Sequence, residues 1–248
     1  MRKHLVTGTF HDSYWEGPLL NRKRGDLLKV DYFIGHNFYY ARDILPPVYT
    51  FTFLRDPVER LYSLWVFMLE HNPDLAAKFD DFMDCARRNP HFSNHQVRFL
   101  GGRYDIRHAR ARVRTREIPR QRMMREVRSL RSKPVNRIDL EIAKDVLGEL
   151  NYVGIFEDFE ASVAALFSSW DITLELPLPR ERQSVVKKAE VINISDSDRE
   201  ELEEINTYDR LLYEAAMKRY ETRRADPAAK IDELGDDEDR GEREESDG

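Results

Sequence analysis

The stretch TFTFLRDPVERLYS at positions 50–63 decides the fold of this 248-residue chain. Residues 48–54 are rich in β-branched and aromatic types and predict a buried strand. Asp56 then suits a helix N-cap, Pro57 the first helical position, and Glu59 the acid of the first turn. Apolar residues follow at helical spacing, which predicts a helix that ends near Asn72-Pro73. These residues are Val58, Leu61, Tyr62, Trp65, Met68 and Leu69.

Outward from this unit, strand patterns alternate with helix patterns. The sequence predicts strands at 27–34 and 152–156, and helices at 76–88, 94–100, 138–149, 157–169 and 198–222. Such alternation favours an α/β fold with a mainly parallel sheet flanked by helices. We expect one domain over residues 1–225, of which 1–26 carry turn formers and give no clear element.

The charges of the chain are distributed unevenly. Residues 103–137 hold twelve Arg and one Lys against three acidic residues, a local charge of +10. Residues 226–248 hold eleven acidic residues against three basic ones, a local charge of −8. We interpret 103–137 as an Arg-rich insertion and 226–248 as a disordered acidic tail.

Composition also bounds the cellular setting. The single cysteine, Cys85, cannot form an internal disulfide, which fits a reducing compartment. No run approaches 18 apolar residues, and the first residues lack the apolar centre of a secretory signal. We therefore expect a cytoplasmic protein that does not span a membrane.

The junction of the strand and the helix is a candidate anion site. The predicted strand delivers Arg55 to a helix N-terminus, where free N–H groups and the helix dipole favour negative charge. The guanidinium adds donors suited to phosphate, and Ser63, two turns into the helix, could add a hydroxyl. The alternative is an ordinary junction in which Arg55 pairs with Asp56 or Glu59 at the surface.

This stretch resembles the 3′-phosphate-binding motif of sulfotransferases that use 3′-phosphoadenosine 5′-phosphosulfate (PAPS). In that motif an Arg closes a strand and a Ser follows eight residues later, the spacing of Arg55 and Ser63. The pattern LRDPVxRxxS is typical of the carbohydrate branch, and three further parts of the chain resemble heparan sulfate 6-O-sulfotransferases. These are FMDC at 82–85 with NHQVRFL at 94–100, the stretch 143–159, and the stretch 203–214.

The resemblance implies a P-loop-NTPase-like sulfotransferase fold, PAPS as sulfate donor, a carbohydrate acceptor and no metal. It assigns the 3′-phosphate to Arg55 and Ser63, and the role of catalytic base to His36, whose ordinary pKa suits proton transfer at neutral pH. The alternative for His36 is a loop histidine that hydrogen-bonds the backbone.

The resemblance also places Asn94, Gln96 and Arg98 in the acceptor or nucleotide pocket. The alternative here is that Asn94 caps a helix and that the other two are exposed at the surface.

The sequence departs from the family at its start. The sulfotransferases of this family begin with a strand and a loop that wraps the 5′-phosphosulfate. In this chain only Thr7-Gly8-Thr9 resembles that loop, and the resemblance is weak. We therefore expect a fold that lacks its first strand, and a chain that folds poorly or binds PAPS weakly. An alternative function is that of a truncated or degenerate relative that binds adenosine 3′,5′-bisphosphate without turnover.

The Arg-rich segment leaves three interpretations open. The first is a solvated helix face, the second a surface for an anionic polysaccharide, and the third a site for nucleic acid. Tyr104 is the only aromatic residue between 103 and 137, which argues against nucleic acid because stacking platforms are missing. The corresponding alternative function is an Arg-rich polyanion-binding protein.

Overall fold

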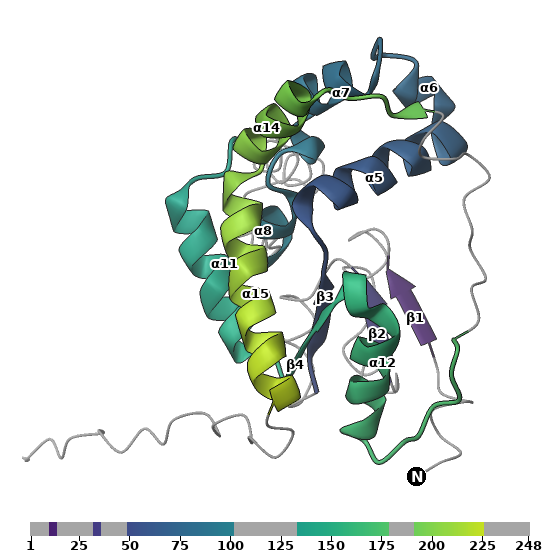
Figure 1. The fold of residues 1–248 in the computed structure, drawn as a ribbon, viewed down its shortest axis with the longest axis vertical. Helices are drawn as coiled ribbons and strands as arrows, with labels where there is room; N and C mark the ends of the chain where they lie inside the picture. Colours follow the sequence, from purple (N-terminus) through teal and green to yellow (C-terminus); the bar gives the residue numbers. More distant parts are fainter. Residues whose placement is uncertain (1–9, 14–31, 36–48, 102–132, 179–190, 226–248) are drawn as a thin grey trace, which may run out of the picture.

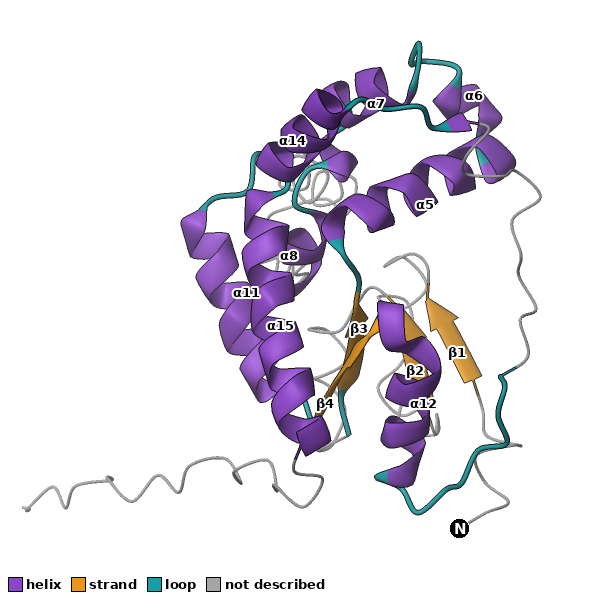
Figure 2. Cartoon of the chain, viewed as in Figure 1, coloured by secondary structure: helices purple, strands orange, loops and turns teal. Residues whose placement is uncertain are grey.

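The computed structural model describes residues 10–13, 32–35, 49–101, 133–178 and 191–225 (Figure 1). Within these ranges the chain is mostly helical, with short strands (Figure 2). The strands are β1 (Phe10–Ser13), β2 (Tyr32–Gly35), β3 (Phe51–Leu54) and β4 (Tyr152–Ile155). The helices are α5 (Pro57–His71), α6 (Pro73–Ala76), α7 (Phe82–Arg88), η1 (Pro90–Phe92), α8 (His95–Leu100), α11 (Arg137–Glu149), η2 (Phe156–Asp158), α12 (Phe159–Ser168), α14 (Asp196–Ile205) and α15 (Thr207–Ala225).

The described strands form two parallel pairs. β1 pairs with β2 from Phe10↔Tyr32 onward, and β3 pairs with β4 from Phe51↔Tyr152 onward. The α/β expectation is confirmed in its coarse form: the described chain is mostly helical, its strand pairs are parallel, and β4 of the pair β3–β4 packs against α12 and α15. One continuous, mainly parallel sheet is not seen among the described residues, where each sheet has two strands.

The pair β3–β4 is fixed at both ends. At the entrance, Asn151 Oδ1 accepts hydrogen bonds from the N–H and the hydroxyl of Thr50, at 2.7 and 3.0 Å. At the exit, the buried Ser162 hydroxyl of α12 accepts from Ile155 N–H and donates to its C=O, both at 3.0 Å. Between these two ends, position 154 of β4 is a glycine. A Cβ there would come within 2.6 Å of the Phe53 ring, so a larger residue would not fit. This packing sets where the chain after β3 begins α5.

Helix α5 forms as the sequence predicts. Asp56 is its N-cap and accepts from Glu59 N–H at 3.0 Å, Pro57 opens it, and it ends at His71. All but one of the predicted apolar positions are buried, and Leu69 is partly buried. The predicted helices at 94–100, 138–149 and 157–169 correspond to α8, α11 and α12.

Two predicted helices are each split, which corrects the sequence-based expectation. The range 76–88 ends α6 and contains α7, because Asp81 starts a new helix by accepting from Asp84 N–H at 2.7 Å. The range 198–222 is divided between α14 and α15 at Asn206. The stretch 1–26, for which the sequence predicts no clear element, contains β1.

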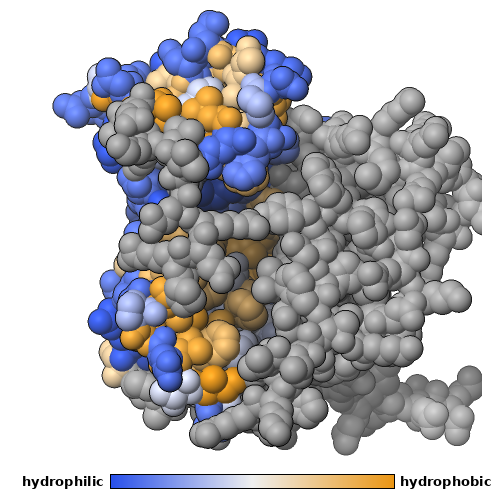
Figure 3. Space-filling view, turned by 90° about the vertical axis from the view of Figure 1, so that its right-hand side faces the viewer, coloured by the Kyte–Doolittle hydropathy of each residue, from blue (hydrophilic) through white to orange (hydrophobic). Residues whose placement is uncertain are grey.

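Two hydrophobic clusters stabilise the fold. One joins β3 and β4 to α8, α11 and α15, and α11 and α15 run side by side (Figure 1). The other joins α5, α7 and α14. On the face shown in Figure 3, hydrophobic residues also gather in two separate areas of the described surface. Among the described residues no helix has the length and apolar character needed to cross a membrane.

Candidate functional site

The candidate site lies where β3 passes into α5, and its backbone is held by a buried side chain. Gln96 of α8 accepts from Arg55 N–H at 2.9 Å through Oε1 and donates to Arg55 C=O at 2.8 Å through Nε2. Both polar atoms of this amide are therefore used on one residue. The clamp fixes the direction in which Arg55 leaves the strand.

The side chain of Arg55 meets Ser63. Arg55 Nη1 donates to the hydroxyl of the exposed Ser63 at 2.5 Å, across two turns of α5. The guanidinium carbon also lies 4.6 Å from the ring centroid of Phe156, within cation–π range. The structure thus brings into contact the two residues to which the resemblance assigns one phosphate.

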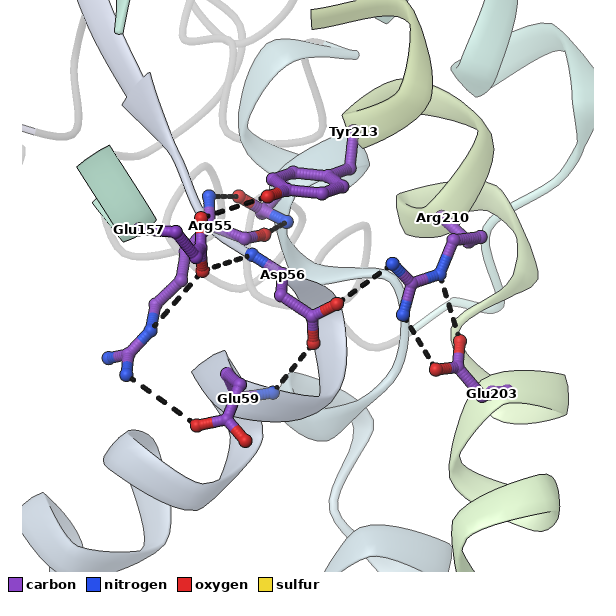
Figure 4. Close-up of polar contacts among 8 residues, drawn as sticks. Arg55, Asp56, Glu59, Glu157, Glu203, Arg210 and Tyr213 are labelled. Carbon is purple, nitrogen blue, oxygen red and sulfur yellow. Dashed lines mark hydrogen bonds and ion pairs between the residues drawn. The ribbon is translucent and has the colours of Figure 1, made fainter. Parts of the chain in front are cut away.

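Two carboxylates face the same guanidinium at longer range (Figure 4). Arg55 Nη2 lies 3.9 Å from Glu59 Oε2, and Nε lies 4.0 Å from Glu157 Oε1. The Nε atom is buried and has no hydrogen-bond partner within the described residues. The predicted surface pairing with Glu59 is present, so an anion at Arg55 would meet a charge that is already partly compensated.

Asp56 forms its ion pair with Arg210 of α15 and not with Arg55. Its Oδ2 accepts from Arg210 Nη1 at 2.8 Å, while its Oδ1 caps α5. Arg210 also binds Glu203 of α14 through Nε at 3.0 Å and Nη2 at 2.6 Å. One guanidinium therefore ties the start of α5 to two other helices, as Figure 4 shows.

Glu157 joins the same network from the turn after β4. Its Oε1 accepts from Asp56 N–H at 2.9 Å, and its Oε2 accepts from the Tyr213 hydroxyl at 2.9 Å. Burial and the bond to Glu157 raise the pKa of Tyr213 above its usual value of 10.0. The phenol therefore stays a donor, and it holds the carboxylate beside the N-terminus of α5.

Asn94 does not cap its own helix, although the sequence offers that interpretation. Asn94 is buried, and its backbone is in the left-handed region with φ of 47°. Its side chain makes no capping hydrogen bond to α8. Its Oδ1 instead accepts from the N–H groups of Tyr208 and Asp209, at 2.9 and 3.0 Å. The residue therefore caps α15.

Helix α8 receives its cap from α15 in return. Asp209 accepts from the N–H groups of Gln96 and Val97, at 3.0 and 2.8 Å. Burial raises the pKa of this carboxyl above 3.8, while the two backbone bonds and the nearby Arg60 and Arg98 oppose the shift. The two helix starts are thus interlocked by an exchange of side chains.

Arg98 is a buried tie between segments. It is 1% exposed and donates to the carbonyls of Ser93 at 2.8 Å and Lys133 at 2.6 Å. Gln96 is buried as well, so the alternative of surface exposure for these two residues is wrong. The hydrogen bonds described for Asn94, Gln96 and Arg98 join other segments of the fold, and among these bonds those of Gln96 reach Arg55.

Some predictions lie outside the described residues. They concern His36, the Arg-rich segment up to residue 132 and the acidic tail. Sequence reasoning in turn missed Glu157, Arg210 and Tyr213 as members of the site. They lie in the stretches 143–159 and 203–214, but local spacing carries no signal for the contacts of Glu157 with Arg55, of Arg210 with Asp56 and of Tyr213 with Glu157.

Comparisons with known proteins add no family assignment. No protein-family model matches the chain, and neither a curated protein nor a solved structure matches it. Within the described residues no group of three or more His, Cys, Asp or Glu side chains is arranged to hold a metal ion. The contact of Arg55 with Ser63 at the start of α5 is the feature of the described structure that most directly suggests a ligand.

Proposed function

We propose that this chain is a sulfotransferase that moves a sulfuryl group from PAPS to a carbohydrate hydroxyl. The observation that carries the proposal is the contact of Arg55 Nη1 with Ser63 Oγ at the start of α5. The spacing of these residues is the part of the sequence that most resembles the 3′-phosphate motif of PAPS-dependent enzymes.

The physical chemistry of the junction supports a phosphate ligand. A guanidinium presents several donors in one plane, and the start of a helix adds the positive end of its dipole. At α5 the N–H groups of Asp56 and Glu59 are already bound, by Glu157 and by Asp56. The Gln96 clamp and the Phe156 ring hold Arg55 before any ligand arrives. A preorganised donor loses less conformational entropy on binding, which raises affinity.

In the proposed reaction the oxygen of an acceptor hydroxyl attacks the sulfur of PAPS. The bond from sulfur to the 5′-phosphate oxygen breaks, and adenosine 3′,5′-bisphosphate leaves. We assign the proton of the hydroxyl to His36, on the sequence resemblance alone. The Arg-rich segment is the proposed contact for an acceptor with negative charge, such as an anionic polysaccharide.

Calorimetric titration with adenosine 3′,5′-bisphosphate tests the phosphate site. We expect binding by the wild-type chain and a loss of at least about tenfold in affinity for Arg55→Ala, which removes a charged hydrogen-bond donor. Arg88→Ala is the matched control, because that side chain is 60% exposed and its described contacts are with Asp84 and Phe79, not with Arg55. Equal affinity of the two variants, or no binding by a folded wild-type chain, would refute the proposal.

Transfer is tested separately from binding. Radiolabelled PAPS is incubated with the chain and with a panel of desulfated polysaccharides, and label in the polymer is counted. Label that depends on Arg55 supports a transferase. Binding of the bisphosphate without label in any acceptor would favour the relative that binds the nucleotide without turnover.

A further inference from the structure

The carboxylate of Glu157 occupies a position that suits a bound anion. It accepts the N–H of Asp56 at the N-terminus of α5, at 2.9 Å, and lies 4.0 Å from Arg55 Nε. These are a backbone donor and a cationic donor of the kind that a phosphate would use. The group is an anion supplied by the chain itself (Figure 4).

We propose that Glu157 is a built-in competitor of the anionic ligand, and that a phosphate binds at Arg55 by exchanging with this carboxylate. The inference rests on the proposed function, since it concerns regulation of the same site. The exchange sets a minimum binding free energy for the ligand. An anion binds only when its interactions with Arg55, Ser63 and the start of α5 are more favourable than those of the Glu157 carboxylate that it displaces. Weakly bound anions are therefore kept out of the site.

Glu157 is placed so that it can leave. It lies in the short turn η2, and its side chain is 39% exposed, so water can solvate the carboxylate once it is displaced. At 4.0 Å its contact with Nε is longer than a hydrogen bond. Arg55 does not depend on Glu157 for its place, because Gln96, Ser63 and the Phe156 ring still hold it.

Tyr213 sets how firmly the competitor is held. From α15, its hydroxyl donates to Glu157 Oε2, while Asp56 N–H donates to the other oxygen, Oε1. A ligand that displaces Glu157 also breaks this bond. The affinity of the site therefore depends on a tyrosine that the phosphate itself does not have to contact.

The test compares Glu157→Gln with the wild-type chain in titrations with adenosine 3′,5′-bisphosphate at constant salt. The amide keeps the shape and the acceptor for Asp56 N–H but removes the charge, so we expect binding about fivefold tighter. Glu160→Gln makes the same change of net charge in the first turn of α12, where none of the described contacts with Arg55 involves it, and should leave affinity unchanged. Tyr213→Phe frees one carboxylate oxygen and should tighten binding about twofold.

The outcomes separate the two proposals. Arg55-dependent binding by the wild-type chain, with equal or weaker binding by Glu157→Gln, overturns the competitor and leaves the phosphate site standing. Equal tightening by Glu160→Gln also overturns it, since the effect would then come from net charge. Absence of binding by the wild-type chain and by Glu157→Gln, with both folded, overturns the inference and the proposed function together.

Discussion

Two polar helix junctions in this molecule use similar residues in different ways. At the interlocked starts of α8 and α15, Asn94 and Asp209 are buried and bind backbone N–H groups at 2.8–3.0 Å. At the start of α5, Arg55 is partly exposed, and its two carboxylate contacts are at 3.9 and 4.0 Å. The first junction has closed hydrogen bonds, whereas at the second the guanidinium of Arg55 is only loosely paired with its two carboxylates.

The difference separates polar residues that build the fold from those that remain available to a ligand. We call the interlocked starts of α8 and α15 the inner junction, and the start of α5 with Arg55 the outer junction. A buried donor without a partner costs about 1–3 kcal/mol, so the hydrogen bonds of the inner junction have to be complete in the folded protein. An exposed ion pair contributes about 0–1 kcal/mol, so the outer junction can exchange partners at small cost. Substitutions at the two junctions should therefore act on different properties, namely on stability and on binding.

The largest effect is expected for Asp209→Ala. It leaves the buried N–H groups of Gln96 and Val97 without their acceptor, which should lower the free energy of unfolding by about 3 kcal/mol. Urea unfolding followed by circular dichroism measures the loss. Asp74→Ala removes an exposed acid from the first turn of α6 and serves as control. A loss below that of the control would break the distinction between the junctions.

Gln96 connects the two junctions, so its substitution should affect both properties. Gln96→Met keeps the length of the side chain but leaves Arg55 N–H and C=O without their described partners, at a cost of about 2 kcal/mol. Affinity for adenosine 3′,5′-bisphosphate should also fall, because Arg55 loses its backbone clamp. Unfolding and titration are measured on the same preparation. Reduced stability with unchanged affinity would show that the clamp does not serve the site.

Asp56→Ala should cost about 1 kcal/mol, the usual contribution of an N-cap. Asp56→Asn keeps a capping oxygen and removes the charge that pairs with Arg210, so it separates the cap from the ion pair. A double-mutant cycle of Asp56→Asn with Arg210→Met measures their coupling. Additive losses of unfolding free energy would mean that Arg210 does not act through Asp56.

The smallest effect on stability is expected for Ser63→Ala. The residue is exposed on α5 and alanine favours a helix, so the free energy of unfolding should change by less than about 0.5 kcal/mol. Binding of adenosine 3′,5′-bisphosphate should nevertheless weaken severalfold, as measured by calorimetry. A large loss of stability would place Ser63 with the inner junction and contradict the comparison.

The outer junction could be predicted from the sequence because its signals are local. Strand composition, the cap at Asp56, the proline after it and the eight-residue spacing of Arg55 and Ser63 all lie within 50–63. Propensity and periodicity act over such distances, and the structure has the strand, the helix and the contact there. The roles of Arg55 and Ser63 toward a phosphate remain a prediction.

The inner junction could not be predicted, because its signals are long-range. The helix pattern over 198–222 is continuous, and the break at Asn206 depends on Asn94, more than a hundred residues earlier in the chain. Gln96 and Arg98 read as surface residues by type, and only tertiary contacts account for their burial. The membership of Glu157, Arg210 and Tyr213 in the site has the same origin.

The exchange of caps between α8 and α15 has a consequence for the order of folding. Asp209 follows Val97, in the first turn of α8, by 112 residues, so this turn has no cap until α15 docks. Closing so long a loop carries an entropic cost and slows contact formation. During synthesis we therefore expect α8 to become stable only after α15 has been made and has docked. The amides of Gln96 and Val97 should gain protection from hydrogen exchange at the same time as those of α15.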